Sequence, residues 1–151
     1  MFEFTVSPLE AEMAVRSIVA AIFGLLIGME RRGGHTGAGM RTFSLICMGS
    51  ALFTVLSAQG FGPGTDPSRL AAQIVTGIGF IGAGVIWRQR EEAIHGITTA
   101  AAIWVSAAVG IAVGLGYYVL SSSLTVVVML LLSRGHPLKG AKESLQCELQ
   151  T

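Results

Sequence analysis

Long apolar stretches separated by short polar segments dominate this chain. No Asp, Glu, Lys or Arg occurs from Leu70 to Trp87 or from Ile97 to Ser133. A membrane-spanning helix requires roughly 20 apolar residues to cross about 30 Å of hydrocarbon. The pattern predicts helices over residues 8–28, 42–58, 67–87, 98–113 and 118–133. We therefore expect an all-α fold, a polytopic membrane protein that forms a bundle of five transmembrane helices.

Local signals place the ends of these helices. Ser7-Pro8-Leu9-Glu10 is a capping box with proline at the first helical position, and Asp66-Pro67 starts the third helix in a similar way. One helix over residues 97–133 would be about 55 Å long, nearly twice the hydrocarbon thickness. We therefore expect a break at Gly114–Tyr118, where glycines allow a turn and tyrosines favour the membrane interface.

The third predicted helix carries four glycines in eight residues. At about 100° of rotation per residue, Gly77 and Gly84 share one face with Leu70 and Gln73, whereas Gly79 and Gly82 lie on the opposite face. Small residues allow helix backbones to approach closely in lipid. We therefore expect this helix to be central, with neighbours on both sides. The alternative is that glycine is simply common in membrane helices.

Composition supports the membrane class and argues against several others. Of 151 residues, 52% are hydrophobic and 13% are charged, against about 25% charged in an average soluble domain. A net charge of +1 does not indicate nucleic-acid binding. Gly77–Gly82 matches G-x-G-x-x-G but lacks the strand and the acidic residue of a dinucleotide site. Cys47 and Cys147 indicate neither a disulfide nor a metal site. We expect no catalytic site, no metal site and no cofactor.

Basic residues give an expected orientation. Five passes place eight of the ten Lys and Arg residues on one side, namely Arg31, Arg32, Arg41, Arg88, Arg90, Arg134, Lys139 and Lys142. By the positive-inside rule, the N-terminus is then periplasmic and the C-terminus cytoplasmic. The start of the chain has neither a positive region nor a cleavage site, so we expect it to remain in the mature protein. Residues 1–135 form the transmembrane domain and residues 136–151 a short cytoplasmic tail.

Two polar features leave alternatives open. Arg16 is four residues after Glu12, so the two can pair on one helix face, and its guanidinium would extend toward the membrane interface; the alternative is a functional buried charge. The glycine-rich segment Gly33–Gly39 reads as a flexible connector or as an anion cradle built from backbone N–H groups.

Charged side chains at the helix ends are the strongest candidates for function. Glu30 lies near Arg41 if the first two helices form a hairpin, and Asp66 and Arg69 are three residues apart in one turn. Such groups serve either as structural caps and clasps or as a functional site. The only polar side chains in the helix interiors from residue 42 onward are amides and hydroxyls. Hydroxyls in membrane helices usually bond to backbone or to neighbours.

Five motifs in fixed order give the chain a family resemblance. They are Gly28-Met29-Glu30-Arg31, Ala38-Gly39-Met40-Arg41-Thr42, Asp66-Pro67-Ser68-Arg69 with Ala71-Ala72-Gln73, Gly77–Gly84, and His95-Gly96-Ile97-Thr98-Thr99-Ala100-Ala101. The ordered set resembles the MgtC/SapB family of bacterial inner-membrane proteins. The resemblance implies a multi-pass protein of the bacterial inner (plasma) membrane, linked to magnesium homeostasis and virulence. It implies the short SapB-like form, without the C-terminal ACT-like domain of other members.

The candidate functional residues come from these motifs. They are Glu30, Arg31, Gly39, Arg41, Thr42, Asp66, Arg69, Gln73, Gly77, Gly79, Gly82, Gly84, Gly96, Thr98 and Thr99.

Two functions remain open from the sequence. The first is a non-enzymatic protein that contacts the lipid bilayer and other membrane proteins during magnesium limitation, with a homo-oligomer as one option. Gly24/Gly28 and Gly110/Gly114 would then supply lateral contact surfaces. The alternative is a small channel or transporter for an ion or small solute, in which the third helix is broken and exposes carbonyl groups. The absence of carboxylates from the interiors of the later helices argues against transport.

Overall fold

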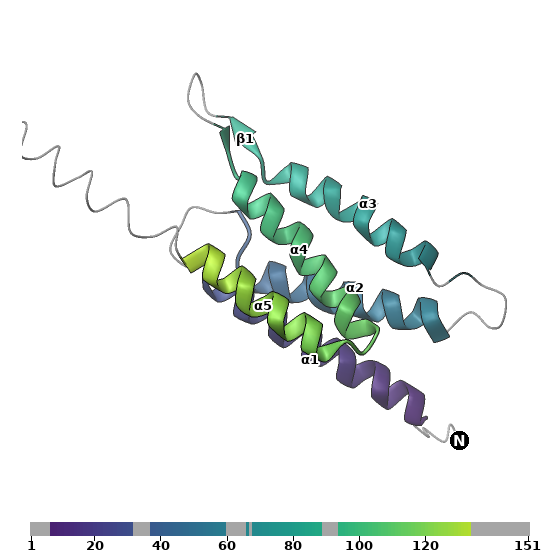
Figure 1. Ribbon diagram of the computed structural model, residues 1–151. Helices are drawn as coiled ribbons and strands as arrows, with labels where there is room; N and C mark the ends of the chain where they lie inside the picture. The colour runs from purple at the N-terminus through teal and green to yellow at the C-terminus, as the bar shows by residue number, and fades with distance from the viewer. Residues whose placement is uncertain (1–6, 32–36, 60–65, 67, 89–93, 134–151) are drawn as a thin grey trace, which may run out of the picture.

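The computed structural model describes residues 7–31, 37–59, 66, 68–88 and 94–133 (Figure 1). Within these ranges the elements are α1 (Pro8–Met29), α2 (Met40–Gln59), α3 (Ser68–Gly84), β1 (Trp87–Arg88), β2 (Ile94–His95), α4 (Ile97–Gly114) and α5 (Tyr118–Ser133). Three of these helices, α1, α2 and α4, are long and apolar enough to cross a membrane. The all-α architecture is as predicted, and passage of all five helices through the bilayer stays a prediction.

The predicted helix ends have clear local causes. Ser7 Oγ accepts a hydrogen bond from the Glu10 N–H at 3.1 Å, and a Glu10 carboxylate oxygen accepts one from the Ser7 N–H at 2.8 Å. This reciprocal pair confirms the capping box. Between α4 and α5 the chain turns at Gly116, whose φ of +83° lies in the left-handed region that glycine adopts without strain. The predicted break is therefore confirmed.

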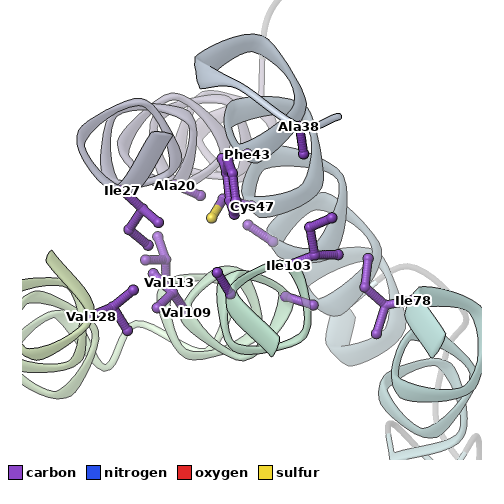
Figure 2. Packing of buried hydrophobic residues seen from close by; sticks show 13 residues of the cluster. Ala20, Ile27, Ala38, Phe43, Cys47, Ile78, Ile103, Val109, Val113 and Val128 are labelled. Atoms are coloured by element: carbon purple, nitrogen blue, oxygen red, sulfur yellow. The ribbon is translucent and has the colours of Figure 1, made fainter. Parts of the chain in front are cut away.

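The core of the protein lies where α1, α2 and α4 meet. Ala20 and Ile27 of α1, Phe43 and Cys47 of α2, and Ile103 of α4 are fully buried there (Figure 2). In Figure 2, α3 and α5 flank this centre, and each sends one labelled side chain toward it. Because hydrocarbon offers apolar side chains no drive to leave lipid, close van der Waals packing is what holds such a core together.

Glycines set how closely these three helices approach. A Cβ added at Gly28 would stand 2.5 Å from the Met40 Cα, and one added at Gly24 would strike the Phe43 carbonyl oxygen. On the other side of α2, a Cβ at Gly114 would stand 2.8 Å from the Ala51 carbonyl oxygen. A Cβ at Gly110 would strike the Cys47 carbonyl oxygen. α2 is thus clasped between the glycine faces of α1 and α4.

This packing corrects one prediction. Gly24/Gly28 and Gly110/Gly114 were expected to form lateral surfaces for other proteins, but all four residues are buried within the chain. The glycine spacing indicates a close helix contact, and it does not say whether the contacting helix belongs to the same molecule. Here the contacts are intramolecular.

The position of α3 corrects a second prediction. The helix was expected to be central, but it lies along the edge of the bundle beside α4 and α2 (Figure 1). Only Ile78 and Gly82 are buried among its residues. A Cβ at Gly82 would meet Ala100 of α4 at 3.7 Å, an ordinary contact, whereas Gly77, Gly79 and Gly84 have nothing within 4 Å of an added Cβ. Although glycines lie on two faces of α3, only the Gly82 position packs against a neighbouring helix.

The connection from α3 to α4 also differs from expectation. The third helix was predicted to reach residue 87, but α3 ends at Gly84, and Trp87–Arg88 pairs with Ile94–His95 as an antiparallel two-stranded hairpin. Residues 89–93 lie outside the described part of the chain.

Successive helices run antiparallel (Figure 1). One end of the bundle therefore holds the end of α1, the start of α2 and the connection from α3 to α4, and it is called here the Arg31 end. The opposite end, where α3 begins, is called the Asp66 end.

Candidate functional site

Arg31 links two helices at the Arg31 end. Its Nη2 donates a hydrogen bond to the Thr99 hydroxyl in the first turns of α4, and Thr99 is buried. Partial burial lowers the pKa of the Arg31 guanidinium through desolvation, but an arginine side chain stays charged at physiological pH. The structure therefore brings together two candidate residues from motifs that lie 68 positions apart.

The remaining candidates at this end are not gathered into one cluster. Glu30 and Arg41 are both exposed, and no ion pair joins them in the described part of the chain, so the expected clasp is wrong.

Gly96 has a backbone role: its φ is +92°, and a Cβ there would strike the Val85 carbonyl oxygen. Gly39 and Thr98 are exposed. Residues 32–36, which include most of the suggested anion cradle, lie outside the described residues.

Asp66 acts as a cap at the other end. Its Oδ1 accepts hydrogen bonds from the Ser68 hydroxyl at 2.7 Å and from the Ser68 N–H at 2.9 Å. These bonds hold the pKa of the Asp66 carboxyl below its ordinary value. Within the described residues, Asp66 and Arg69, three residues apart, form no ion pair within 4.0 Å, although the Arg69 charge also contributes to lowering the pKa of Asp66. Asp66 therefore starts α3, as its position before Pro67 indicated, and Arg69 is exposed.

Arg16 has a structural role that the sequence did not reveal. It forms the predicted ion pair with Glu12, and its Nη1 also donates a hydrogen bond at 2.5 Å to the carbonyl oxygen of Gly114, at the end of α4. The guanidinium therefore donates a hydrogen bond to a carbonyl group that lacks a partner within its own helix, and it does not simply extend to the membrane interface. The contact spans 98 residues, so no local pattern could have found it.

One face of α3 is turned away from the rest of the chain. Five residues at helical spacing are all exposed on it, namely Arg69, Gln73, Thr76, Phe80 and Gly84. We call this set the outward face of α3. Phe80 is 85% exposed, the highest value among the exposed large hydrophobic side chains. The Thr76 hydroxyl bonds to the Ala72 carbonyl oxygen, whereas Gln73 has no hydrogen bond within the described residues.

A groove of about 640 Å³ runs between α2 and α3. From α2 it is lined by Thr42, Leu45, Ile46, Gly49, Ser50 and Phe53. From α3 it is lined by Leu70, Gln73, Ile74, Gly77, Ile78 and Ile81. We call this the α2/α3 groove. Its walls are almost wholly apolar, and it brings together three candidate residues, Thr42, Gln73 and Gly77, of which Gln73 also belongs to the outward face.

The interior of the bundle offers little for ion coordination. Four of the buried hydroxyls, those of Thr54, Ser106, Ser121 and Thr125, bond to carbonyl oxygens on their own helix. Across the described residues, no group of three or more His, Cys, Asp or Glu side chains is placed to hold a metal. These four hydroxyls are therefore engaged within their own helices.

Comparison with known proteins agrees with the sequence motifs. Residues 18–141 match the MgtC family. The chain is 50% identical over 135 residues to a protein of Escherichia coli K12 named "Putative magnesium transporter YhiD". It is 39% identical over 131 residues to an uncharacterized protein of Haemophilus influenzae. It is 42% identical over 112 residues to Protein MgtC of Salmonella typhimurium LT2.

These matches cover 85%, 82% and 74% of this chain, but only 62%, 55% and 47% of the respective relatives. The chain thus spans about half to three fifths of the curated relatives it matches. No solved structure matches it. The family match covers α2 to α5 and the part of α1 from residue 18 onward, together with the motif residues. The chain therefore belongs to the MgtC family.

Proposed function

We propose that this protein is a non-enzymatic membrane protein that acts in adaptation to low magnesium by contacting other membrane proteins through α3. The observation that carries the proposal is the outward face of α3. Polar side chains in membrane helices normally face the protein interior, where they find partners. Here Gln73 is exposed at the rim of the α2/α3 groove, on the same helix face as Phe80, which lies two turns further along.

The link to magnesium comes from relatives. A 50% identical relative carries magnesium transport in its name, and the chain belongs to the MgtC family. Since the chain covers at most 62% of those relatives, only the part of their function that resides in the membrane helices is proposed here. Location in the bacterial inner membrane, with the Arg31 end in the cytoplasm, is part of the same proposal and rests on the excess of basic residues at that end.

Phe80→Ala in α3 tests this proposal against Val119→Ala in α5. Both side chains are more than four-fifths exposed, at 85% and 82%, so neither change removes a contact within the chain. We expect Phe80→Ala to impair rescue of a deletion strain at limiting magnesium and to reduce recovery of bound membrane proteins in mild detergent. Val119→Ala should leave both unchanged. Equal behaviour of the two variants would contradict the proposal.

A second function, magnesium transport, is favoured by the printed name of the Escherichia coli relative. It requires a polar path, whereas the buried hydroxyls described above bond to their own helices. Purified protein in liposomes that hold a magnesium-sensitive dye separates the two functions. Our proposal expects no influx above that of protein-free vesicles. An influx that Asp66→Asn abolishes would establish transport instead.

A further inference from the structure

The outward face of α3 and the α2/α3 groove form one continuous surface, because Gln73 belongs to both. One glycine from each helix lines the groove. Gly49 in α2 and Gly77 in α3 both line it, and nothing lies within 4 Å of a Cβ added at either position. Two neighbouring helices thus present bare backbone beside a free amide, a surface that another helix can approach closely.

The amide of Gln73 indicates what kind of partner fits this surface. A glutamine side chain carries both an acceptor oxygen and a donor NH₂ group, so two identical amides can satisfy each other. Hydrocarbon tails, which would surround Gln73 in the span predicted for α3, provide neither donor nor acceptor. An identical helix supplies the matching group without any further requirement, provided that it presents Gln73 at the same level.

The charges at the start of α3 also indicate that an identical helix fits this surface. Asp66 and Arg69 are both exposed, and they form no ion pair with each other in the described part of the chain. Two copies inserted in the same direction hold their α3 helices parallel, so Asp66 of one copy and Arg69 of the other differ in level by about 4.5 Å. Around a two-fold axis this yields two reciprocal pairs of opposite charge. The pattern is complementary to itself.

We propose that the occupant of the α2/α3 groove is a second copy of this chain. The α3 helices of two copies pack in parallel about a two-fold axis along the membrane normal, each covering the groove of the other. The Gln73 amides hydrogen-bond across the axis, and Gly77 permits the close approach. This inference rests on the proposed function, since it names the partner of the same surface.

Disulfide crosslinking in native membranes tests the arrangement. The background retains the buried Cys47, which an oxidant in the membrane does not reach, and carries Cys147→Ser. Gln73→Cys should form a disulfide-linked dimer. Val75→Cys is the matched control: it lies two residues away, is 44% exposed, and points about 160° away around the helix. We expect at least a tenfold lower yield from the control. Gln73→Cys also removes the amide, so the result is read beside light scattering of the wild type: no crosslink together with a monomeric wild type, or equal yields from the two variants, would overturn the proposal.

A second pair of variants tests the groove itself. Gly77→Leu places a side chain in the groove, whereas Gly79→Leu adds the same side chain on the same helix outside it, and nothing lies within 4 Å of a Cβ added at either position. Light scattering of each purified protein in mild detergent should show that Gly77→Leu dimerises at least tenfold more weakly than the wild type. Gly79→Leu should dimerise normally. A wild-type monomer that carries lipid in the groove, or one bound only to a different protein, would refute the dimer.

The two proposals fail separately. If Phe80→Ala loses rescue and bound membrane proteins while Gln73→Cys forms no dimer, the contact function holds and its partner is a different protein. If Gln73→Cys crosslinks but neither Phe80→Ala nor Gly77→Leu affects growth at limiting magnesium, the dimer stands and the proposed function is wrong.

Discussion

The glycines of α4 and those of α3 have the same local sequence character but opposite structural roles. Gly110 and Gly114 lie against the backbone of α2, where an added Cβ would strike main-chain atoms. Gly77 and Gly84 have nothing within 4 Å of an added Cβ. Glycine spacing in a membrane helix therefore identifies a surface suited to close approach, but its partner can be inside or outside the molecule. The difference separates the packed interior of this protein from the exposed part of α3, which is the proposed contact surface.

The largest effect should come from adding a side chain on the interior side. In Gly110→Leu the new Cβ strikes the Cys47 carbonyl oxygen, so α2 and α4 must separate. We expect a loss of about 3 kcal/mol of stability or failure to fold, because backbone cannot rotate out of the way as a side chain can. Thermal unfolding in detergent measures this. Gly77→Leu, with the same added side chain, should unfold near the wild-type temperature at a dilution at which both proteins are monomeric; similar losses in both would contradict the distinction.

Removal of the Arg16 contact should have the next largest effect. Its side chain is 17% exposed and joins α1 to the end of α4 through the Gly114 carbonyl. Arg16→Ala should reduce the free energy of unfolding by roughly 1.5–3 kcal/mol, as expected for a hydrogen bond to a charged group. Arg69→Ala, at an exposed arginine on α3, should change it by less than about 0.5 kcal/mol. Denaturant titration of both variants would show whether the interior and the edge differ in this way.

Filling the contact surface should alter association and leave stability intact. A tenfold weaker dimer of Gly77→Leu corresponds to about 1.4 kcal/mol of association free energy. This value is smaller than the loss expected for Gly110→Leu, and it should be seen in the concentration dependence of the molecular mass. If Gly77→Leu lowered the unfolding temperature and left the mass distribution unchanged, the groove would be part of the interior.

The smallest effect concerns the cap of α3. Hydrogen bonds from the hydroxyl and N–H of Ser68 hold the pKa of Asp66 below its ordinary value of about 4. A group with a lowered folded pKa stabilises the protein above the unfolded pKa, and this contribution is lost as the pH falls through the folded pKa. The unfolding temperature of the wild type should therefore decline below about pH 4. Asp66→Asn should show a smaller decline, and an equal decline would exclude Asp66 as its source.

Local sequence signals were sufficient to place the helices. The predicted range 118–133 coincides with α5 (Tyr118–Ser133), and the largest difference in any helix end is at α3, which stops at Gly84 rather than at residue 87. Capping residues and glycines act within a few residues of a helix end, and membrane thickness limits the length of each helix. These signals can therefore be recognised in the sequence without knowledge of tertiary contacts. The hairpin after α3 was not predicted because two residues per strand form no periodic pattern.

Tertiary contacts were much less accessible from the sequence. Arg31 and Thr99 were both candidates, but they are 68 positions apart, and no local sequence pattern indicates that they form a hydrogen bond. Glu30 and Arg41 were paired on proximity alone, and the structure leaves both exposed. The groove depends on which faces of α2 and α3 turn toward each other, and Gly49 was missed because its role depends on its distance from another helix.

The edge position of α3 has a consequence for biosynthesis. A ribosome releases helices in chain order, so α1 and α2 can form their clasp at once, but the core is complete only when α4 emerges. Until then α3 has part of the α2 surface to rest against and lacks Ala100, the α4 residue nearest to Gly82. The third helix is therefore made before much of its own docking site exists. During that interval the Gly82 side of α3 has no α4 partner in its own chain.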